Sequence, residues 1–149
     1  MTQVPAFSLE GSDGATHTND SLAGAPYVLY FYPKDNTPGC TTEACDFRDN
    51  IARIESAGVK VLGVSPDSIK SHHKFIEKFE LPFVLLSDPE HALAESLGAW
   101  GPKKFMGKEY DGIIRSTFLI NAEGEIAQEW KKVKVKGHVD AVLEAIDAL

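Results

Sequence analysis

The sequence has only two cysteines in 149 residues, no excess of basic residues and no long apolar run. A formal net charge of −7 argues against a surface for nucleic acid or anionic lipid, because such surfaces need clustered positive charge. No stretch approaches the roughly 20 apolar residues that cross a bilayer, and residues 1–5 do not begin a signal peptide. We therefore expect a cytoplasmic protein with no nucleic-acid or membrane partner.

The sequence also lacks the glycine motifs of nucleotide-binding folds. Neither G-x-G-x-x-G nor G-x-x-x-x-G-K-[ST] follows an expected strand, so a doubly wound nucleotide-binding fold, the alternative architecture, has no support. Hydrophobic residues make up 43% and charged residues 25%, which is typical of globular domains. A length of 149 residues fits one core, so we expect a single domain over residues 1–149.

Short runs of β-branched and aromatic residues predict four buried strands, at residues 27–32, 59–64, 83–86 and 116–120. Apolar residues at helical spacing between the first two runs predict one helix that ends at Gly58. Asp13-Gly14 predicts a turn, and residues 121–124 predict the turn of a β-hairpin.

Two further helices carry N-terminal signals, and a third, amphipathic helix closes the chain. Asp67 is expected to cap one of them. Asp88 followed by Pro89 predicts the start of another, which should end near Gly98. The order of elements predicts a three-layer α/β domain, with a central mixed sheet flanked by helices and a short β-rich N-terminal extension.

Lysines cluster near the C-terminus, although the chain as a whole is acidic. Lys132, Lys134 and Lys136 alternate with valines, which predicts an extended segment with one lysine face. Edge strands often carry lysine to prevent unwanted pairing, and we favour that interpretation over a phosphate site.

The most informative segment joins the first expected strand to the helix after it. Thr37 as the N-cap and Pro38 as the first helical residue place Cys40 in the first turn. Free amides and the helix dipole stabilise an anion there, so we expect thiolate character at Cys40. The thiolate is the nucleophilic form of cysteine and the form that peroxides oxidise.

Cys45 lies five residues after Cys40, in the same expected helix. Helix geometry puts their Cα atoms about 8 to 9 Å apart, beyond the range of about 4.4 to 6.8 Å that a disulfide spans. A disulfide between them therefore requires the first helical turns to unwind, and Gly39, a poor helix former, lowers the cost.

Spacing alone leaves other interpretations open. In one, Cys45 is a small buried residue and Cys40 an unused thiol, because C-x-x-x-x-C is a weak motif. In another the cysteines belong to a structural zinc site, but His72 and His73 are adjacent on a different helix and are expected as a partly exposed pair. Glu43 is expected to close the helix N-terminus or to bond within the site, rather than to act as a catalytic base.

The sequence FYPKDNTPGCTTEAC at residues 31–45 resembles the active-site signature of the peroxiredoxins, specifically the Q-type or bacterioferritin comigratory protein group. The similarity continues in VLGVSPD at 61–67, LLSDPEH at 85–91 and FMGKEYDGIIRSTFLI at 105–120. This resemblance implies a thioredoxin-like fold and a thiol-dependent peroxidase that uses no metal, haem or flavin.

Carried over residue by residue, the resemblance implies that Cys40 is the peroxidatic cysteine and Cys45 the resolving cysteine. Pro33, Thr37 and Arg115 are the remaining active-site residues of the pattern. Without the resemblance, Arg115 is an arginine before an apolar strand, a place where the side chain is usually solvated.

The implied reaction reduces hydrogen peroxide and organic hydroperoxides through a Cys40 sulfenic acid and a Cys40–Cys45 disulfide. A dithiol such as thioredoxin is the expected reductant, no cofactor is expected, and the intramolecular disulfide favours a monomer. Two alternatives differ in function: a general disulfide oxidoreductase, which usually carries a C-x-x-C pair, and a non-catalytic thioredoxin-fold binding or chaperone module.

Overall fold

The computed structural model describes residues 2–149, with Phe105 described by its backbone alone; Met1 lies outside the described residues. The strands are β1 (Ser8–Gly11), β2 (Thr16–Thr18), β3 (Tyr27–Phe31), β4 (Lys60–Ser65), β5 (Val84–Ser87), β6 (Trp100–Phe105), β7 (Lys108–Ile113), β8 (Ser116–Ile120) and β9 (Ile126–Trp130). The helices are α1 (Asn19–Leu22), α2 (Pro38–Asp49), α3 (Ile51–Ser56), α4 (Ile69–Phe79), α5 (Ala92–Ser96) and α6 (His138–Asp147).

In the described part of the chain, seven strands form one sheet in the order β2-β1-β5-β4-β3-β8-β9. The central strands β3, β4 and β5 are parallel, and β1 and β8 pair antiparallel with the outer two of them. This confirms the expected mixed sheet, and the β1–β2 hairpin confirms the β-rich beginning. Because the parallel strands share a direction, the loops after β3, β4 and β5 meet at one edge of the sheet.

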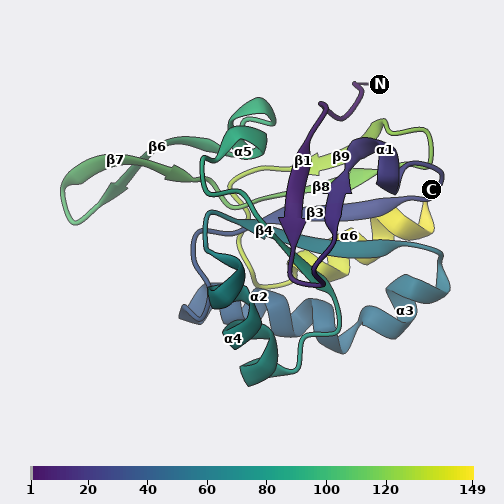
Figure 1. Cartoon of the computed structure of the whole chain (residues 1–149), viewed down its shortest axis with the longest axis horizontal. Helices are drawn as coiled ribbons and strands as arrows, with labels where there is room; N and C mark the ends of the chain where they lie inside the picture. Colours follow the sequence, from purple (N-terminus) through teal and green to yellow (C-terminus); the bar gives the residue numbers. More distant parts are fainter. Residues whose placement is uncertain (1) are drawn as a thin grey trace.

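Alternating side chains of β3 supply two cores, one on each face of the sheet. Val28 and Tyr30 face the core formed with α2, α3, α4 and α6, whereas Leu29 and Phe31 face the core formed with α1 and α5. Figure 1 shows the larger group of helices on one side of the sheet and α1 and α5 on the other. Strand β3 is buried on both sides, which explains its continuous apolar sequence.

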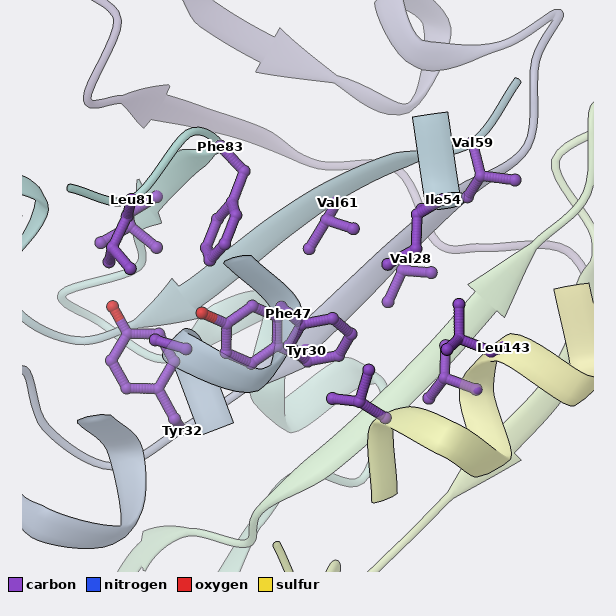
Figure 2. Close-up of a cluster of buried hydrophobic side chains, with 14 of the residues drawn as sticks. Val28, Tyr30, Tyr32, Phe47, Ile54, Val59, Val61, Leu81, Phe83 and Leu143 are labelled. Atoms are coloured by element: carbon purple, nitrogen blue, oxygen red, sulfur yellow. The ribbon is translucent and has the colours of Figure 1, made fainter. Parts of the chain in front are cut away.

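Helix α2 is fixed to the sheet through Phe47. Its ring stacks on the ring of Tyr30, with centroids 4.6 Å apart, and Figure 2 shows both rings within the buried cluster. Phe47 and Tyr30 are each 0% exposed. Burial of an aromatic side chain of this kind stabilises a fold by about 1.5 to 3 kcal/mol.

The helix expected to run to Gly58 is instead two helices, because the backbone leaves helical geometry at Asn50, with φ −112° and ψ 7°. The Asn50 side chain donates to the carbonyl of Asp46, a local bond that competes with helix continuation. The expected stop is confirmed: Gly58 follows α3 with a φ of +77°.

Two expected helix caps are wrong in position. Ser68, not Asp67, caps α4 and accepts from the amide of Ser71. Helix α5 begins at Ala92 after His91, several residues later than Pro89, although the Asp88 carboxylate still accepts from the Ala94 amide at 3.1 Å.

The lysine-rich segment is not an edge strand. It forms an irregular connection between β9 and α6, and Lys132 has a φ of +51°, which interrupts extended geometry.

A second difference is the β6–β7 hairpin, which the sequence did not predict. It forms a separate two-stranded sheet that projects from the body of the molecule (Figure 1).

Candidate active site

The loop after β3 leads directly into α2 with the expected cap positions. Thr37 is the N-cap, with φ −101° and ψ 155°, and Pro38 is the first helical residue. The Thr37 side chain does not cap the helix; its hydroxyl donates to the carbonyl of Lys34 at 2.8 Å. Because that bond uses the hydroxyl proton, the oxygen lone pairs can accept a hydrogen bond from a ligand.

Cys40 lies in the first turn of α2 beneath the guanidinium of Arg115. The Nη2 of Arg115 donates to the Sγ of Cys40 at 3.3 Å, and the thiol residue is only 2% exposed. Cys40 is therefore a buried residue at a helix N-terminus, beside a cation. A positive charge at hydrogen-bond distance stabilises the anionic form of the sulfur.

Strand pairing places Arg115 at this position. Ser116 is opposite Phe31 in the β3–β8 register, so Arg115 lies beside the point where β3 enters the active-site loop. Its carbonyl accepts from the amide of Val133 at 2.9 Å, which fixes the backbone. The usual expectation for an arginine before a strand, a solvated side chain, is wrong here: the side chain is 17% exposed.

Glu43 is the second anion on Arg115. Its Oε1 accepts from Nη1 at 2.7 Å, its side chain is 0% exposed, and its Oε2 has no hydrogen-bond partner among residues 2–149. Burial raises the pKa of Glu43 to about 7, against the opposing effect of Arg115. Of the two expectations for Glu43, a cap and a bond within the site, the structure shows the second.

The remaining two residues of the expected site lie on the same segment. Pro33 is partly buried in the loop after β3. Cys45 is partly exposed in the second half of α2, and both cysteines are free thiols. The structure therefore brings Cys40, Glu43 and Arg115 into contact, whereas Cys45 is on the same intact helix as Cys40.

Some polar residues near this loop were not found from the sequence. His72 was expected to be partly exposed but is 0% exposed, and it bonds to the buried carboxylate of Asp35. Lys103 donates to the carbonyl of Ile113, two residues before Arg115, at 2.8 Å. Burial lowers the pKa of Lys103, and Arg115 lowers it further. The burial and hydrogen-bond partners of these side chains depend on the tertiary structure, so sequence spacing could not identify them.

Within residues 2–149, no group of three or more histidine, cysteine, aspartate or glutamate side chains is arranged to hold a metal ion. In the same range no helix has both the length and the apolar character needed to span a bilayer.

Comparison with known proteins gives consistent matches along the chain. Residues 1–129 match the model of the AhpC/TSA family. Peroxiredoxin Bcp of Bacillus subtilis is 53% identical over 144 residues, covering 97% of this chain and 92% of that protein. Peroxiredoxin Bcp of Escherichia coli K12 is 47% identical over 140 residues, covering 94% and 90%.

Solved structures show the same likeness in three dimensions. Peroxiredoxin Q of Xanthomonas campestris superposes with a TM-score of 0.91 at 48% identity, covering 95% of this chain and 90% of that chain. A ligand-complex structure of the Xanthomonas campestris bacterioferritin comigratory protein, described in terms of alkyl peroxide reduction, has a TM-score of 0.90 at 47% identity with the same coverage. These matches confirm the expected thioredoxin-like peroxiredoxin fold.

Proposed function

Because the chain belongs to the AhpC/TSA family and is a thiol-dependent peroxidase, we propose that Cys40 is its peroxidatic nucleophile and Cys45 its resolving cysteine. Its substrate is a hydroperoxide and its reductant a thiol. The relatives' names favour this activity over a general disulfide oxidoreductase or a non-catalytic binding module.

One observation carries the assignment of Cys40: the 3.3 Å contact between its sulfur and the guanidinium of Arg115. The other cysteine, Cys45, is partly exposed beyond the first turn of α2. A nucleophilic cysteine needs a stabilised thiolate, and the first turn of a helix beside an arginine supplies two sources of that stabilisation.

In the first step the Cys40 thiolate attacks the terminal oxygen of the hydroperoxide. A sulfur–oxygen bond forms, the oxygen–oxygen bond breaks, and the alkoxide or hydroxide leaves with the electron pair and takes up a proton. Sulfur is oxidised to the sulfenic acid and the peroxide is reduced to alcohol or water. Negative charge moves from sulfur to the leaving oxygen, so a guanidinium beside the reacting atoms stabilises the transition state.

Thr37 and Pro33 complete the site in this proposal. The Thr37 oxygen accepts from the hydroperoxide O–H and aligns the O–O bond with the sulfur, which reduces the entropic cost of reaching the transition state. Pro33 has no amide proton to donate to water or ligand, and it fixes the backbone where the loop begins.

In the second step the thiol of Cys45 condenses with the sulfenic acid, and water is released. Both cysteines are within α2, and five residues of helix separate their Cα atoms by about 8 to 9 Å, too far for a disulfide. The first turns of α2 must therefore unwind before Cys45 reaches Cys40.

A protein dithiol such as thioredoxin then reduces the disulfide by exchange. Because both cysteines belong to one chain, the cycle needs no second subunit, and we propose that the protein works as a monomer in the cytoplasm.

Peroxide consumption with a thioredoxin recycling system tests the assignment. Cys40→Ser is expected to abolish turnover. Cys45→Ser is expected to consume one equivalent of peroxide, hold a sulfenic acid that reacts with a dione probe, and then stop. Turnover by Cys40→Ser at a wild-type rate, or the absence of a Cys40–Cys45 disulfide from the peroxide-treated wild-type protein in mass spectrometry, would refute the proposal.

A further inference from the structure

A buried carboxylate, Asp35, fixes the loop that precedes α2. Its side chain is 3% exposed and accepts hydrogen bonds from the Tyr32 hydroxyl at 2.6 Å and the Ser71 hydroxyl at 2.8 Å; the Nδ1 of His72 lies 2.7 Å from the same carboxylate. The backbone amide of Asp35 donates to the carboxylate of Asp67 at 2.7 Å. One residue thus connects the loop to α4 and to the segment after β4.

His72 extends this connection to the next strand. Its side chain is 0% exposed, and its Nε2 lies 2.9 Å from the carbonyl oxygen of Leu86 in β5. A carbonyl oxygen can only accept, so Nε2 carries a proton and the ring orientation is fixed. The bond on Nδ1 is then a short, buried contact with the Asp35 carboxylate, of the kind that is costly to break from one side.

The contacts of Asp35 and those of the first turn of α2 do not overlap. Asp35 bonds to Tyr32 at the end of β3, to α4 and to the segment after β4, whereas Cys40 and Glu43 bond to Arg115. Unwinding the first turns of α2 breaks the second set and leaves the first intact. The boundary between the two sets lies at Thr37 and Pro38, the cap and first residue of the helix.

We propose that Asp35 and His72 form a positioning pair that keeps residues 33–37 anchored to α4 and β5 while α2 unwinds and re-forms in each cycle. This inference rests on the proposed Cys40–Cys45 disulfide. Pro33 and Thr37 then remain in the position for peroxide binding in the oxidised protein, and α2 re-forms from a cap that is already in place. Because helix nucleation is the costly step, a fixed cap accelerates the return to the reactive state.

Hydrogen exchange of the wild-type protein tests the anchor without any substitution. The amide of Asp35 is expected to exchange within about threefold of the same rate in the reduced and the disulfide forms, because its acceptor does not move. Amides in the first half of α2 are expected to exchange at least about a hundredfold faster in the disulfide form. Loss of protection at Asp35 together with α2 would overturn the proposal.

Variants separate positioning from general stability. His72→Asn shortens the side chain and is expected to accelerate exchange at Asp35 in the disulfide form at least about tenfold. After the disulfide is reduced, the variant should also regain its reactivity with peroxide more slowly than wild type. Its first turnover, measured by stopped flow on fully reduced protein, should be slowed less than this recovery. His73→Asn is the matched control, since His73 is exposed on the same helix and its side chain bonds to the carbonyl of Ser12 rather than to the active-site loop.

A conservative variant checks the geometry. Asp35→Asn can still accept from Tyr32 and donate to Nδ1 of a neutral His72, so it is expected to retain protection that Asp35→Ala loses. Equal loss of protection at the amide of residue 35 in Asp35→Asn and Asp35→Ala would overturn the positioning role. The same conclusion would follow if His72→Asn slowed the first turnover and the recovery by the same factor. Disulfide mapping in the same samples is a separate readout, because the absence of a Cys40–Cys45 disulfide would refute the proposed function rather than the anchor.

Discussion

The Nη2 of Arg115 lies 3.3 Å from the Sγ of Cys40, although 75 residues separate them in sequence. The same guanidinium binds Glu43 at 2.7 Å, so one side chain before β8 holds two buried residues of α2. These contacts connect the reactivity of the thiol to the folded state of its helix, because the proposed unwinding of α2 would separate Cys40 from the guanidinium.

Substitution of Arg115 should lower the rate of the peroxide step. Arg115→Ala removes a charged donor beside the reacting atoms and is expected to reduce the second-order rate constant by about 10²- to 10³-fold. Arg115→Lys should recover only part of this loss, because an ammonium cannot reach Cys40 and Glu43 with two parallel donors. Stopped-flow measurement of peroxide reduction, alongside the thiolate absorbance at 240 nm, checks this. An unchanged rate constant in Arg115→Ala would exclude the guanidinium from the reaction.

The Thr37 hydroxyl should matter for its oxygen rather than its size. Thr37→Val keeps the volume but removes both the bond to Lys34 and the acceptor, and should reduce the peroxide rate constant by about 10- to 100-fold. Thr37→Ser keeps the hydroxyl and should remain within about threefold of wild type. Steady-state kinetics of both variants against hydrogen peroxide and an organic hydroperoxide provide the comparison, and equal rates for Val and Ser would contradict it.

Glu43 should make stability depend on pH with a defined sign. Its pKa is about 7 in the folded protein against an ordinary value of 4.5, so the folded state retains a proton that the unfolded chain releases as pH rises between these values. The carboxyl therefore destabilises the fold progressively from pH 4.5 to 7, by about 3 kcal/mol in total.

Urea unfolding of reduced wild-type and Glu43→Gln protein at pH 5 and pH 7.5 measures this effect. The variant should gain stability relative to wild type as pH rises, because glutamine does not titrate. His138 acts in the opposite direction in both proteins, since burial lowers its pKa to about 4, and the comparison cancels it. A constant difference between the two proteins at both pH values would show that Glu43 is ionised throughout.

Gly39 should set how easily α2 unwinds. Gly39→Ala favours the helix by about 1 kcal/mol and is expected to slow disulfide formation about fivefold. The added Cβ would lie 3.3 Å from Nη2 of Arg115, so the guanidinium must move slightly and the peroxide step should slow less than the disulfide step. Rapid quench of both steps with mass spectrometry compares them, and faster disulfide formation in the variant would contradict the unwinding step.

The sequence predicted well wherever one local rule decides the structure. Pro38 after Thr37 predicted where α2 begins, and the continuous apolar run of residues 27–32 predicted a strand that is buried on both faces. The place of Cys40 in the first turn followed from the same cap. The distance between Cys40 and Arg115 could not be predicted from spacing, because it depends on the pairing of β3 with β8. The family resemblance supplied that residue.

Two of the wrong predictions, those for Asp67 and His72, share a physical cause: a polar side chain can bond to more than one kind of partner. Asp67 has the residue type of a helix cap, but its carboxylate binds the amide of Asp35 and the hydroxyl of Ser65 instead. His72 has the pattern of a half-exposed helix residue, yet Asp35 and the Leu86 carbonyl satisfy both ring nitrogens in the interior. Local propensity does not reveal which long-range partner a polar group finds.

Arg115 directly precedes β8 and is not part of α2, and this position affects how the protein binds its reductant. In the reduced protein the guanidinium, 17% exposed, contacts the sulfur of Cys40 and the carboxyl of Glu43, which both belong to α2. In the proposed cycle α2 unwinds, both contacts are lost, and the guanidinium stays beside β8. The guanidinium is then more accessible in the disulfide form than in the reduced form, so a reductant with an acidic contact surface would bind the disulfide form more tightly.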